Sequence, residues 1–578
     1  MKFKLKTLAL AILGATAVVA QAGSNLGPYS PVTDARLENP EPKNWLMYRG
    51  NYSGWGYSPL DKINTANVKK LTLAWSSATG VTEGHQAPPI VNNGYMYVTT
   101  PNAQVIAFNA KTGKEIWRYK KEIPADLLML HNTNRGVALY GNKVYVATVD
   151  SHLIALDAVT GKVVWDKEVG DVKALSYITL APLAAKGKIL VGSSGGETGI
   201  RGFVAAFDAD TGKEAWRTFM TAAPGTPGGD TWPGDTHKQG GASVWITGTY
   251  DAKNNIAYWG TGNPAPWPTE GRKGDNLYST SVVALNVDNG EIKGHHQYHH
   301  NDAWDWDEVS APVLVNTEVK GRKVNGAIHA GRNGYLWMLD RQQSGKIDFV
   351  NAVPYVHNDV FTSIDSKTGR PSYSAERTPG MGKAVNFCPS LWGGKDWPPE
   401  AWNPKTKLFY IPANNNLCSE LPKADEITYK KGDLYIGYPI DGVLGSLRYK
   451  DGKKPATIGE LQAWDLNTGK LAWVHKFDRP IWSPLLTTGG NLIFTGGTND
   501  KVFRAFDAKT GKVLWQYNMP SGVTAVPSSF EIDGEQYIAV QAGWGIDAQR
   551  MQSGIDALDS QVTLVPQGGT VMVFKLGK

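Results

Sequence analysis

A short pattern recurs along this chain and restricts the folds open to it more than any other feature. The pattern reads Ala-x-(Asp/Asn)-x-x-(Thr/Asn)-Gly-x-x-x-Trp. Each copy predicts a hairpin in which an outgoing strand ends at the alanine, the Asp or Asn caps a turn, the glycine takes a positive φ and the return strand carries the tryptophan. The copies are Ala107–Trp117, Ala155–Trp165, Ala206–Trp216, Ala463–Trp473 and Ala505–Trp515, with a degraded copy, Ala284–Gly294, that lacks the tryptophan.

One hairpin cannot bury a tryptophan by itself, so neighbouring copies must stack until each indole packs against the next unit. This requirement favours a radial repeat such as a β-propeller. Trp117 and Trp165 are 48 residues apart, and Trp473 and Trp515 are 42 apart, which is close to the size of a four-stranded blade. The sequence therefore predicts an all-β propeller with tryptophan-docking repeats.

Four β-rich runs are expected to be the inner strands of blades: Gly94–Val98, Lys143–Ala147, Lys188–Gly192 and Asn491–Thr495. A ring of blades also needs a closure that leaves no free sheet edge. Residues 23–70 are expected to lead into the ring and close it together with the C-terminal strand Thr570–Leu576.

The first 22 residues have the pattern of a secretory signal peptide. Three lysines within Met1–Lys6 precede the apolar run Thr7–Val19, and Ala20-Gln21-Ala22 is a small-x-small cleavage site. The run is too short for a membrane anchor, which needs about 20 apolar residues. We expect residues 1–22 to be removed and residues 23–578 to reach a bacterial periplasm as a single domain.

Charge and cysteine content narrow the partners. The formal net charge of +6 falls to +3 once the three lysines of the signal peptide are removed, and no basic tract carries interleaved aromatic residues. Nucleic acid is therefore not an expected partner. The two cysteines, Cys388 and Cys418, are expected to form a disulfide in an oxidising compartment. No Cys-x-x-Cys-His motif occurs, so the chain carries no covalent c-type haem of its own.

The segment Asn301–Glu308 contains four carboxylates and two tryptophans. If it is extended, Asp305 and Asp307 point to the same side and repel each other unless a positive charge lies between them. A hard cation would relieve that repulsion. The alternative is a solvated acidic loop, which would leave the two tryptophans exposed.

Several motifs together resemble the type I quinoprotein alcohol dehydrogenases, the methanol and ethanol dehydrogenases that use pyrroloquinoline quinone (PQQ). The motifs are Trp45–Leu60, Gly192–Glu197, Gly260–Trp267, Asp302–Asp307 and Gly331–Gly334. The resemblance covers essentially the whole mature chain. It implies an eight-bladed propeller with PQQ and a metal ion on the central axis, and oxidation of an alcohol to an aldehyde or ketone.

The resemblance also implies roles for individual residues. Glu197, Asn263 and Asp305 match metal ligands, and Asp305 also matches the catalytic base. Arg332 matches the arginine beside the quinone oxygens, and Trp245 matches the tryptophan under the PQQ ring. Further positions that match cofactor-binding residues are Arg135, Thr179, Ser194, Gly195, Gly196, Ser243, Asp396 and Trp482. Cys388 and Cys418 match a non-adjacent disulfide of the family.

Two departures from the family pattern concern the cofactor surroundings. The family normally has two adjacent cysteines shortly before an Asn-Arg-Gly, whereas Leu128-Met129-Leu130-His131 precede Asn134-Arg135-Gly136 in this chain. We expect Met129 or Leu130 to pack on the cofactor instead. Gln86 stands where a glutamate often touches the cofactor. The histidine-rich run 295–300 is expected to be largely exposed and is assigned no role.

Asp307 favours a lanthanide as the metal. Calcium-using members of the family usually have a small uncharged residue at this position, whereas lanthanide-using members carry a second aspartate. With Glu197, Asp305 and a PQQ carboxylate, Asp307 would bring four negative charges to the ion, which suits a +3 better than a +2 ion. The alternative is that Asp307 forms an ion pair with a nearby Arg or Lys.

The predicted function is therefore a periplasmic PQQ-dependent alcohol dehydrogenase that passes electrons to a soluble cytochrome c. Two alternatives remain: a calcium-dependent member with the same reaction, and a non-catalytic propeller that serves as a binding scaffold. The residues do not identify the alcohol, and they leave the oligomeric state open, with a homodimer as one option.

Overall fold

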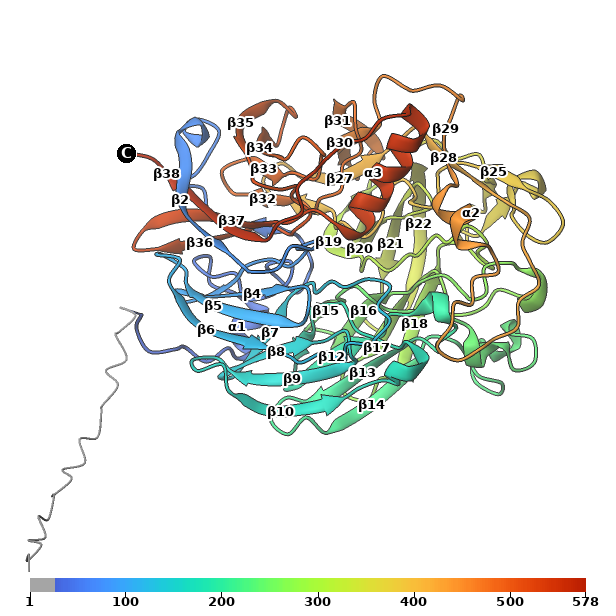
Figure 1. The fold of residues 1–578 in the computed structure, drawn as a ribbon, viewed down its shortest axis with the longest axis horizontal. Helices are drawn as coiled ribbons and strands as arrows, with labels where there is room; N and C mark the ends of the chain where they lie inside the picture. Colours follow the sequence, from blue (N-terminus) through green and yellow to red (C-terminus); the bar gives the residue numbers. More distant parts are fainter. Residues whose placement is uncertain (1–25) are drawn as a thin grey trace, which may run out of the picture.

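The computed structural model describes residues 26–578, and the expected signal peptide, residues 1–22, lies outside this range. Within residues 26–578, eight sheets contain four or five strands each and follow one another around a common centre (Figure 1). The predicted all-β propeller is confirmed, and the sheet count is consistent with eight blades.

The first five sheets use strands in chain order. Their bounds are β3 (Ile90–Asn92), β4 (Tyr95–Thr100), β5 (Gln104–Asn109) and β6 (Glu115–Lys120); β7 (Val137–Tyr140), β8 (Lys143–Ala147), β9 (His152–Asp157) and β10 (Val163–Glu168); β11 (Leu183–Ala185), β12 (Lys188–Gly192), β13 (Phe203–Asp208) and β14 (Glu214–Phe219); β15 (Thr249–Asp251), β16 (Ile256–Gly260), β17 (Ser281–Asn286) and β18 (Ile292–Gln297); β19 (Val313–Val319), β20 (Arg322–Ala330), β21 (Tyr335–Arg341) and β22 (Ile347–Pro354).

The last three large sheets recruit strands from further away in the chain. Their bounds are β26 (Ala401–Asn403), β27 (Leu408–Asn414), β30 (Gly459–Asp465) and β31 (Lys470–Phe477); β1 (Tyr57–Ser58), β32 (Leu486–Thr488), β33 (Leu492–Thr495), β34 (Val502–Asp507) and β35 (Val513–Asn518); β2 (Leu71–Ala78), β38 (Thr570–Leu576), β37 (Glu535–Ala542) and β36 (Ser528–Ile532). Two small sheets are inserted between blades: β23 (Phe361–Ile364) with β24 (Pro371–Tyr373), and β25 (Val385–Phe387) with β28 (Leu417–Leu421) and β29 (Leu447–Tyr449).

The tryptophans join neighbouring blades, as the repeat predicts. The indole nitrogen of Trp117 donates to the backbone carbonyl of Ala158 at 3.1 Å, and that of Trp165 donates to Ala209 at 3.2 Å. The repeat glycine of the next blade cannot be replaced by a residue with a side chain, because a Cβ on Gly161 would lie 2.6 Å from the Trp117 ring. Trp117 is thus held at both its edge and its face by the following repeat.

The degraded copy occupies the same place in its blade. Ala284 pairs with Gly294 in the register in which Ala107 pairs with Trp117. A Cβ on Gly294 would lie 2.4 Å from the carbonyl oxygen of Gly345, so backbone fills the space that the indole takes elsewhere. One further docking tryptophan escaped the sequence pattern: Trp75 donates to the carbonyl of Ala110 at 3.0 Å.

The ring is closed by strands from both ends of the chain. β2 pairs with β38 in antiparallel fashion from Leu71–Leu576 to Ala78–Thr570. The C-terminal strand is therefore as predicted, but its partner begins directly after residues 23–70. Within that lead-in, Tyr57 and Ser58 form a parallel edge strand on β32.

Two expectations about strands and histidines were wrong in detail. The four β-rich runs are not the innermost strands, because the short, buried strands β3, β7, β11 and β32 lie beyond them on the side away from the tryptophan-bearing strands. The histidine-rich run is not largely exposed: His296 and His299 are buried, and His295 and His300 are half-buried. These histidines pack on aromatic neighbours such as Phe349, which a local sequence pattern cannot show.

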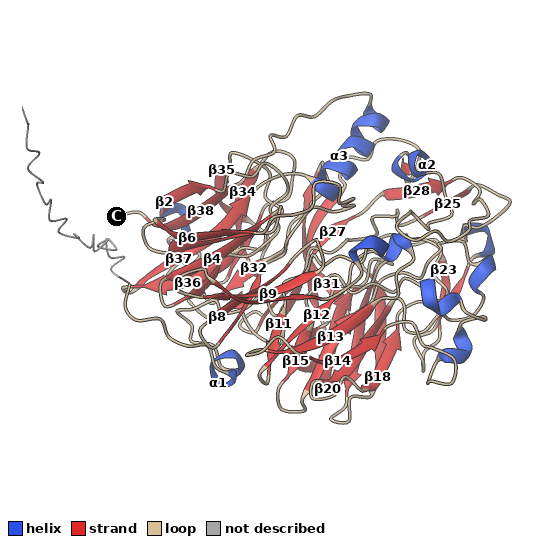
Figure 2. Ribbon diagram, turned by 60° about the horizontal axis from the view of Figure 1, so that its bottom comes forward, coloured by secondary structure: helices blue, strands red, loops and turns tan. Residues whose placement is uncertain are grey.

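Helices are few and lie outside the blades. α1 (Asp34–Glu38) is on one side of the propeller, and α2 (Ile440–Leu444) and α3 (Ile546–Asp559) lie together on the opposite side (Figure 2). No helix formed by residues 26–578 is long and apolar enough to cross a membrane.

Candidate functional site

A cavity of about 310 Å³ lies on the side of the propeller that carries α2 and α3. Loops between the inner ends of several blades supply its polar wall. Ten of the residues singled out from the sequence line it: Arg135, Thr179, Ser194, Gly195, Glu197, Trp245, Asp305, Asp307, Arg332 and Asp396. Residues as far apart in the chain as Arg135 and Asp396, 261 positions, are thus brought to one surface.

Arg332 is at the centre of the acidic group. Its guanidinium lies 2.9 Å from a carboxylate oxygen of Asp396, 3.4 Å from one of Asp307 and 4.0 Å from one of Asp305. Its Nε also donates to the carbonyl oxygen of Leu391 at 3.0 Å. One cation therefore faces three carboxylates at the cavity wall.

The two aspartates reach the cavity by a route that differs from the predicted one. Asp305 lies in a loop rather than a strand and has a φ of 60°, so the alternation of an extended strand does not apply to it. Asp307 lines the same cavity because the chain turns at Asp305. The expectation that both acids share one side is correct, but the extended geometry given as its reason was wrong.

Burial disfavours the charged form of these acids. It raises the pKa of Asp305 well above its ordinary value against the opposing effect of Arg332, and Asp307 raises it further. Burial likewise raises the pKa of Asp307 to about 7, with Arg332 again opposing the shift. The pKa of Asp396 is also raised by burial. A cation bound between Asp305 and Asp307 would reverse this effect and favour both carboxylates.

Arg135 is a buried cation with unused hydrogen-bonding capacity. Its guanidinium lies over the rings of Trp245 and Trp397, 4.9 Å from each centroid, and its Nη1 donates to the hydroxyl of Thr179 at 2.6 Å. Its Nε has no partner, and no carboxylate of residues 26–578 lies within 4 Å of it. A buried, incompletely paired arginine fits a ligand carboxylate, which could accept two parallel hydrogen bonds.

Bare backbone and small hydroxyls complete this side of the cavity. Thr179 and Ser194 share a hydrogen bond of 3.1 Å between their hydroxyls. A Cβ on Gly195 would lie 2.2 Å from the carbonyl oxygen of Leu175, and its φ of 105° also favours glycine. Together with the flat ring of Trp245 and the cation of Arg135, these residues fit a planar, polyanionic cofactor such as PQQ.

Four of the predicted residues do not reach the cavity surface: Asn263, Gly196, Ser243 and Trp482. Asn263 lies directly behind Asp307, to which its backbone N–H donates at 2.7 Å. In the amide orientation that satisfies both side-chain atoms, Asn263 also donates to Asp307 and accepts from Trp267. Ser243 lies beside Gly196, and Trp482 packs edge-to-face on Trp392, which does line the cavity. Their predicted roles stay predictions.

The residues that replace the expected cysteine pair contact α3. Leu130 lines the cavity and Met129 does not, so of the two only Leu130 is placed to contact a cofactor bound there. Arg550 donates to the carbonyl oxygen of Leu130 at 2.9 Å and lies 2.9 Å from Nε2 of His131. Asp547 lies 3.2 Å from the same nitrogen. Gln86 is buried away from the cavity.

The sequence analysis predicted neither the polar cluster of His131, Asp547 and Arg550 nor an apolar wall of the cavity. The wall consists of Trp267, Leu391, Trp392, Leu434, Ile436, Ile440, Val443 and Leu444. Ile440 and Leu444 are 48% and 52% exposed, which is unusual for large apolar side chains. No local sequence pattern predicts which of these residues face the cavity.

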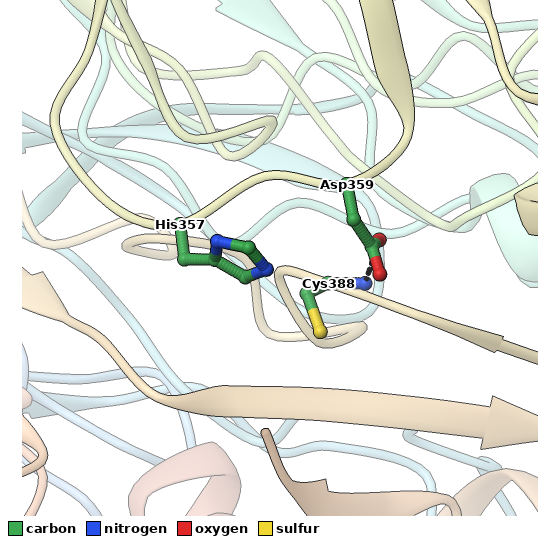
Figure 3. Close-up of side chains that lie close together, drawn as sticks. All are labelled: His357, Asp359 and Cys388. Atoms are coloured by element: carbon green, nitrogen blue, oxygen red, sulfur yellow. Dashed lines mark hydrogen bonds between the residues drawn. The ribbon is translucent and has the colours of Figure 1, made fainter. Parts of the chain in front are cut away.

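The predicted Cys388–Cys418 disulfide is confirmed. Figure 3 shows His357 and Asp359 close to Cys388, a grouping with the types of atom that bind metals. Because the sulfur of Cys388 is bonded to Cys418, it cannot act as a thiolate ligand. Asp359 instead accepts a hydrogen bond from the backbone N–H of Cys388 at 2.8 Å and pairs with Arg377.

Comparison with known proteins gives consistent results. Residues 45–368 and 476–538 match the PQQ family described as "Glucose/ethanol/alcohol dehydrogenase, beta-propeller domain". The quinoprotein alcohol dehydrogenase PedH of Pseudomonas putida is 38% identical over 94% of this chain and 93% of its own. The lanthanide-dependent methanol dehydrogenase of Methylacidiphilum fumariolicum is 36% identical over 87% and 85%. A solved structure of a europium-containing methanol dehydrogenase has a TM-score of 0.86 and 34% identity, covering 94% of this chain and all of that chain.

Proposed function

Since the chain belongs to the family of PQQ-dependent glucose, ethanol and alcohol dehydrogenases, it is a quinoprotein alcohol dehydrogenase, and we propose that the cavity beside Arg332 is its catalytic site. The observation that carries this proposal is the group formed by Arg332 with Asp305, Asp307 and Asp396 in a cavity that also contains the incompletely paired Arg135. A scaffold protein that only binds partners would have no need for such a costly group of buried charges.

The residues have separate roles in the proposal. The cofactor is bound by residues that line the cavity, Arg135, Thr179, Ser194, Gly195, Trp245 and Asp396, with Arg135 on a carboxylate and Trp245 under the ring. Gly196, Ser243 and Trp482 lie behind the cavity surface and are assigned to cofactor binding on the family resemblance alone. Bound PQQ would supply the acceptor for a hydride, and a bound metal ion would supply Lewis acidity toward its carbonyl. Asp305 takes the proton of the alcohol hydroxyl, since it faces the cavity and retains 16% side-chain exposure. Arg332 stabilises negative charge that develops beside it.

We further propose that Glu197, Asn263, Asp305 and Asp307 hold one lanthanide ion. Glu197, Asp305 and Asp307 line the cavity together, and a cation bound there would offset the burial that raises the pKa of both aspartates. Arg332 offers Asp307 an ion pair at 3.4 Å, which is the competing explanation. That arginine is shared with two other carboxylates, so it does not balance the group. The lanthanide-dependent and europium-containing relatives support this choice over calcium.

The apolar wall points to the kind of alcohol. A substrate whose hydroxyl is at Asp305 would extend toward the exposed side chains of Ile440 and Leu444. Covering such side chains yields about 25 cal/mol for each Å² of apolar surface buried. We therefore propose that the preferred alcohol has a bulky apolar substituent rather than the single methyl group of methanol.

Export and electron transfer complete the proposal. Residues 1–22 direct the chain to the periplasm, residues 23–578 act as one domain, and a soluble cytochrome c accepts the electrons, because the chain has no haem attachment motif. A homodimer is the simplest assembly to test.

Reconstitution tests the function directly. Purified protein is incubated with PQQ and either calcium or a light lanthanide, and dye-linked oxidation of an alcohol panel is measured beside the absorbance of the bound cofactor. Activity that requires PQQ and metal together is the expected result. Failure to bind PQQ with any metal would contradict the proposal and leave the scaffold alternative.

A further inference from the structure

A buried row of polar side chains lies behind the cavity wall and joins the two residues proposed to act on the alcohol. Oδ2 of Asp302 accepts a hydrogen bond from the backbone N–H of Asp305 at 3.0 Å. Nε2 of His299 lies 2.9 Å from Oδ1 of Asp302, and Nδ1 of His299 lies 3.2 Å from the amide nitrogen of Asn333. Asn333 follows Arg332 directly in the chain. The row therefore runs from one proposed catalytic residue to the other.

None of the side chains in this row is accessible to solvent. His299, Asp302 and Asn333 are each 0% exposed. Water cannot satisfy their polar atoms, so an unpaired donor or acceptor at these positions would carry the full cost of desolvation. Each side chain is therefore restricted to the orientation that its neighbours accept.

The neighbours of Asn333 determine the tautomer of His299. The Asn333 side-chain oxygen accepts from the backbone N–H of Tyr335 at 3.0 Å and from the indole of Trp337 at 3.2 Å. Its NH₂ group must then point at His299, whose Nδ1 becomes the acceptor. The proton of the neutral imidazole lies on Nε2 and is donated to Asp302. Glu308 lies 3.5 Å from Nδ1 and would favour a charged imidazolium. The NH₂ group of Asn333 points at the same nitrogen, which therefore must accept a hydrogen bond, and His299 is neutral.

At its Asp305 end, the row stabilises a strained backbone conformation. Asp305 has a φ of 60°, in the left-handed region that side chains other than glycine disfavour. Its N–H is held by Asp302, whose carboxylate is in turn fixed by His299. At the other end, Glu308 accepts from the backbone N–H groups of Arg332 at 3.1 Å and Asn333 at 3.3 Å.

We propose that neutral His299 is a positioning residue that sets the placement of the Asp305 carboxylate relative to Arg332. The inference rests on the proposed function, since it concerns how accurately the base is held. His299 does not line the cavity and acts only through Asp302 and Asn333.

Two substitutions test the proposal. Glutamine can donate and accept at positions close to those of a neutral imidazole, whereas leucine can do neither. His299→Leu should lower kcat by about 100-fold, the cost expected for a catalytic group displaced by roughly 1 Å, with a smaller effect on KM. His299→Gln should stay within about threefold of wild type in kcat and keep its pH profile, because its amide replaces a group that does not change charge.

The matched control is His296, which is buried on the same segment but stacks on Phe349 and has no partner for its Nε2 among the described residues. His296→Leu removes a buried nitrogen that has no partner within residues 26–578, so it should leave kcat close to that of wild type. Crystal structures of the metal-free proteins give a readout that needs no activity: Asp305 should keep its positive φ in wild type and His299→Gln and lose it in His299→Leu.

Other outcomes would overturn the proposal. Full turnover and an unchanged Asp305 in His299→Leu would show that the row positions nothing. Equal impairment of His299→Gln and His299→Leu would show that an imidazolium charge is needed. If wild type itself oxidises no alcohol after reconstitution, the proposed function fails, but the φ of Asp305 in the variants still decides the positioning role.

Discussion

The indole nitrogen of Trp245 donates a hydrogen bond of 2.9 Å to the carboxylate of Asp307. The proposed platform for the cofactor ring and the acid proposed to select the metal are thus in direct contact. The backbone N–H of Asn263 holds the other oxygen of Asp307 at 2.7 Å. Because both donors fix the carboxylate, a substitution of Asp307 also frees the Trp245 ring, and cofactor binding has to be measured in each variant.

Asp305→Asn should leave the protein folded and able to bind PQQ while turnover falls by about 10²–10⁴-fold, the usual contribution of a general base. The amide keeps the shape of the side chain but cannot accept the alcohol proton. Dye-linked turnover measures the loss, and the absorbance of bound PQQ together with thermal unfolding provides the control. Turnover close to wild type would mean that another group is the base.

Asp307→Ala should reduce activity supported by lanthanum or cerium at least about tenfold more than activity supported by calcium, because it removes one of the negative charges that suit a trivalent ion. Asp307→Asn is the matched variant, since it keeps an acceptor for Trp245 and removes only the charge. Metal titrations of both variants, followed by activity, measure the effect. Full activity with calcium alone in wild type, unchanged by either substitution, would refute the lanthanide assignment.

Leu444→Ala should lower kcat/KM for an alcohol with a bulky apolar substituent by about tenfold and change kcat/KM for ethanol little, since removal of apolar contact costs roughly 1–3 kcal/mol. Leu564, which is 88% exposed and lies outside the cavity, supplies the control Leu564→Ala. A dye acceptor excludes effects on a cytochrome partner. An equal loss for both alcohols would contradict the proposed apolar subsite.

The metal-free protein should lose stability as the pH rises toward 7. The folded state raises the pKa of Asp307 from 3.8 to about 7, so it binds more protons than the unfolded state between these values, and the free energy of unfolding falls with pH across that window. Asp307→Asn should weaken this dependence, and added metal should remove it. Urea unfolding between pH 4 and pH 8 measures it. A free energy of unfolding that rises across the window in wild type relative to Asp307→Asn would contradict the shift.

The fold was largely predictable because its signal is periodic. The repeat defines a hairpin, and the register of Ala107 with Trp117 recurs at Ala284 and Gly294 even where the tryptophan is lost. The docking tryptophan on β2, Trp75, was not predicted because its strand pairs with a strand from the far end of the chain. Local patterns carry no information about such a pairing.

Many of the residues that line the candidate site could be named from the sequence, but its geometry could not be predicted. Asp305 and Asp307 could be placed at one surface, but the left-handed turn at Asp305 depends on Asp302 and on a histidine that local reasoning assigned no role. The contact of His131 with α3 joins positions more than 400 residues apart, and no spacing rule links them.

Closure of the ring by β2 and β38 has a consequence for biosynthesis. The docking site for the last tryptophan of the repeats, Trp515, is the carbonyl oxygen of Leu71, and the strand that carries Leu71 finds its partner only in residues 570–576. A nascent chain that leaves the ribosome in order from its N-terminus therefore keeps one open edge until residues 570–576 have emerged. Removal of the final nine residues should leave a chain with every residue of the proposed site present and no complete ring to hold them.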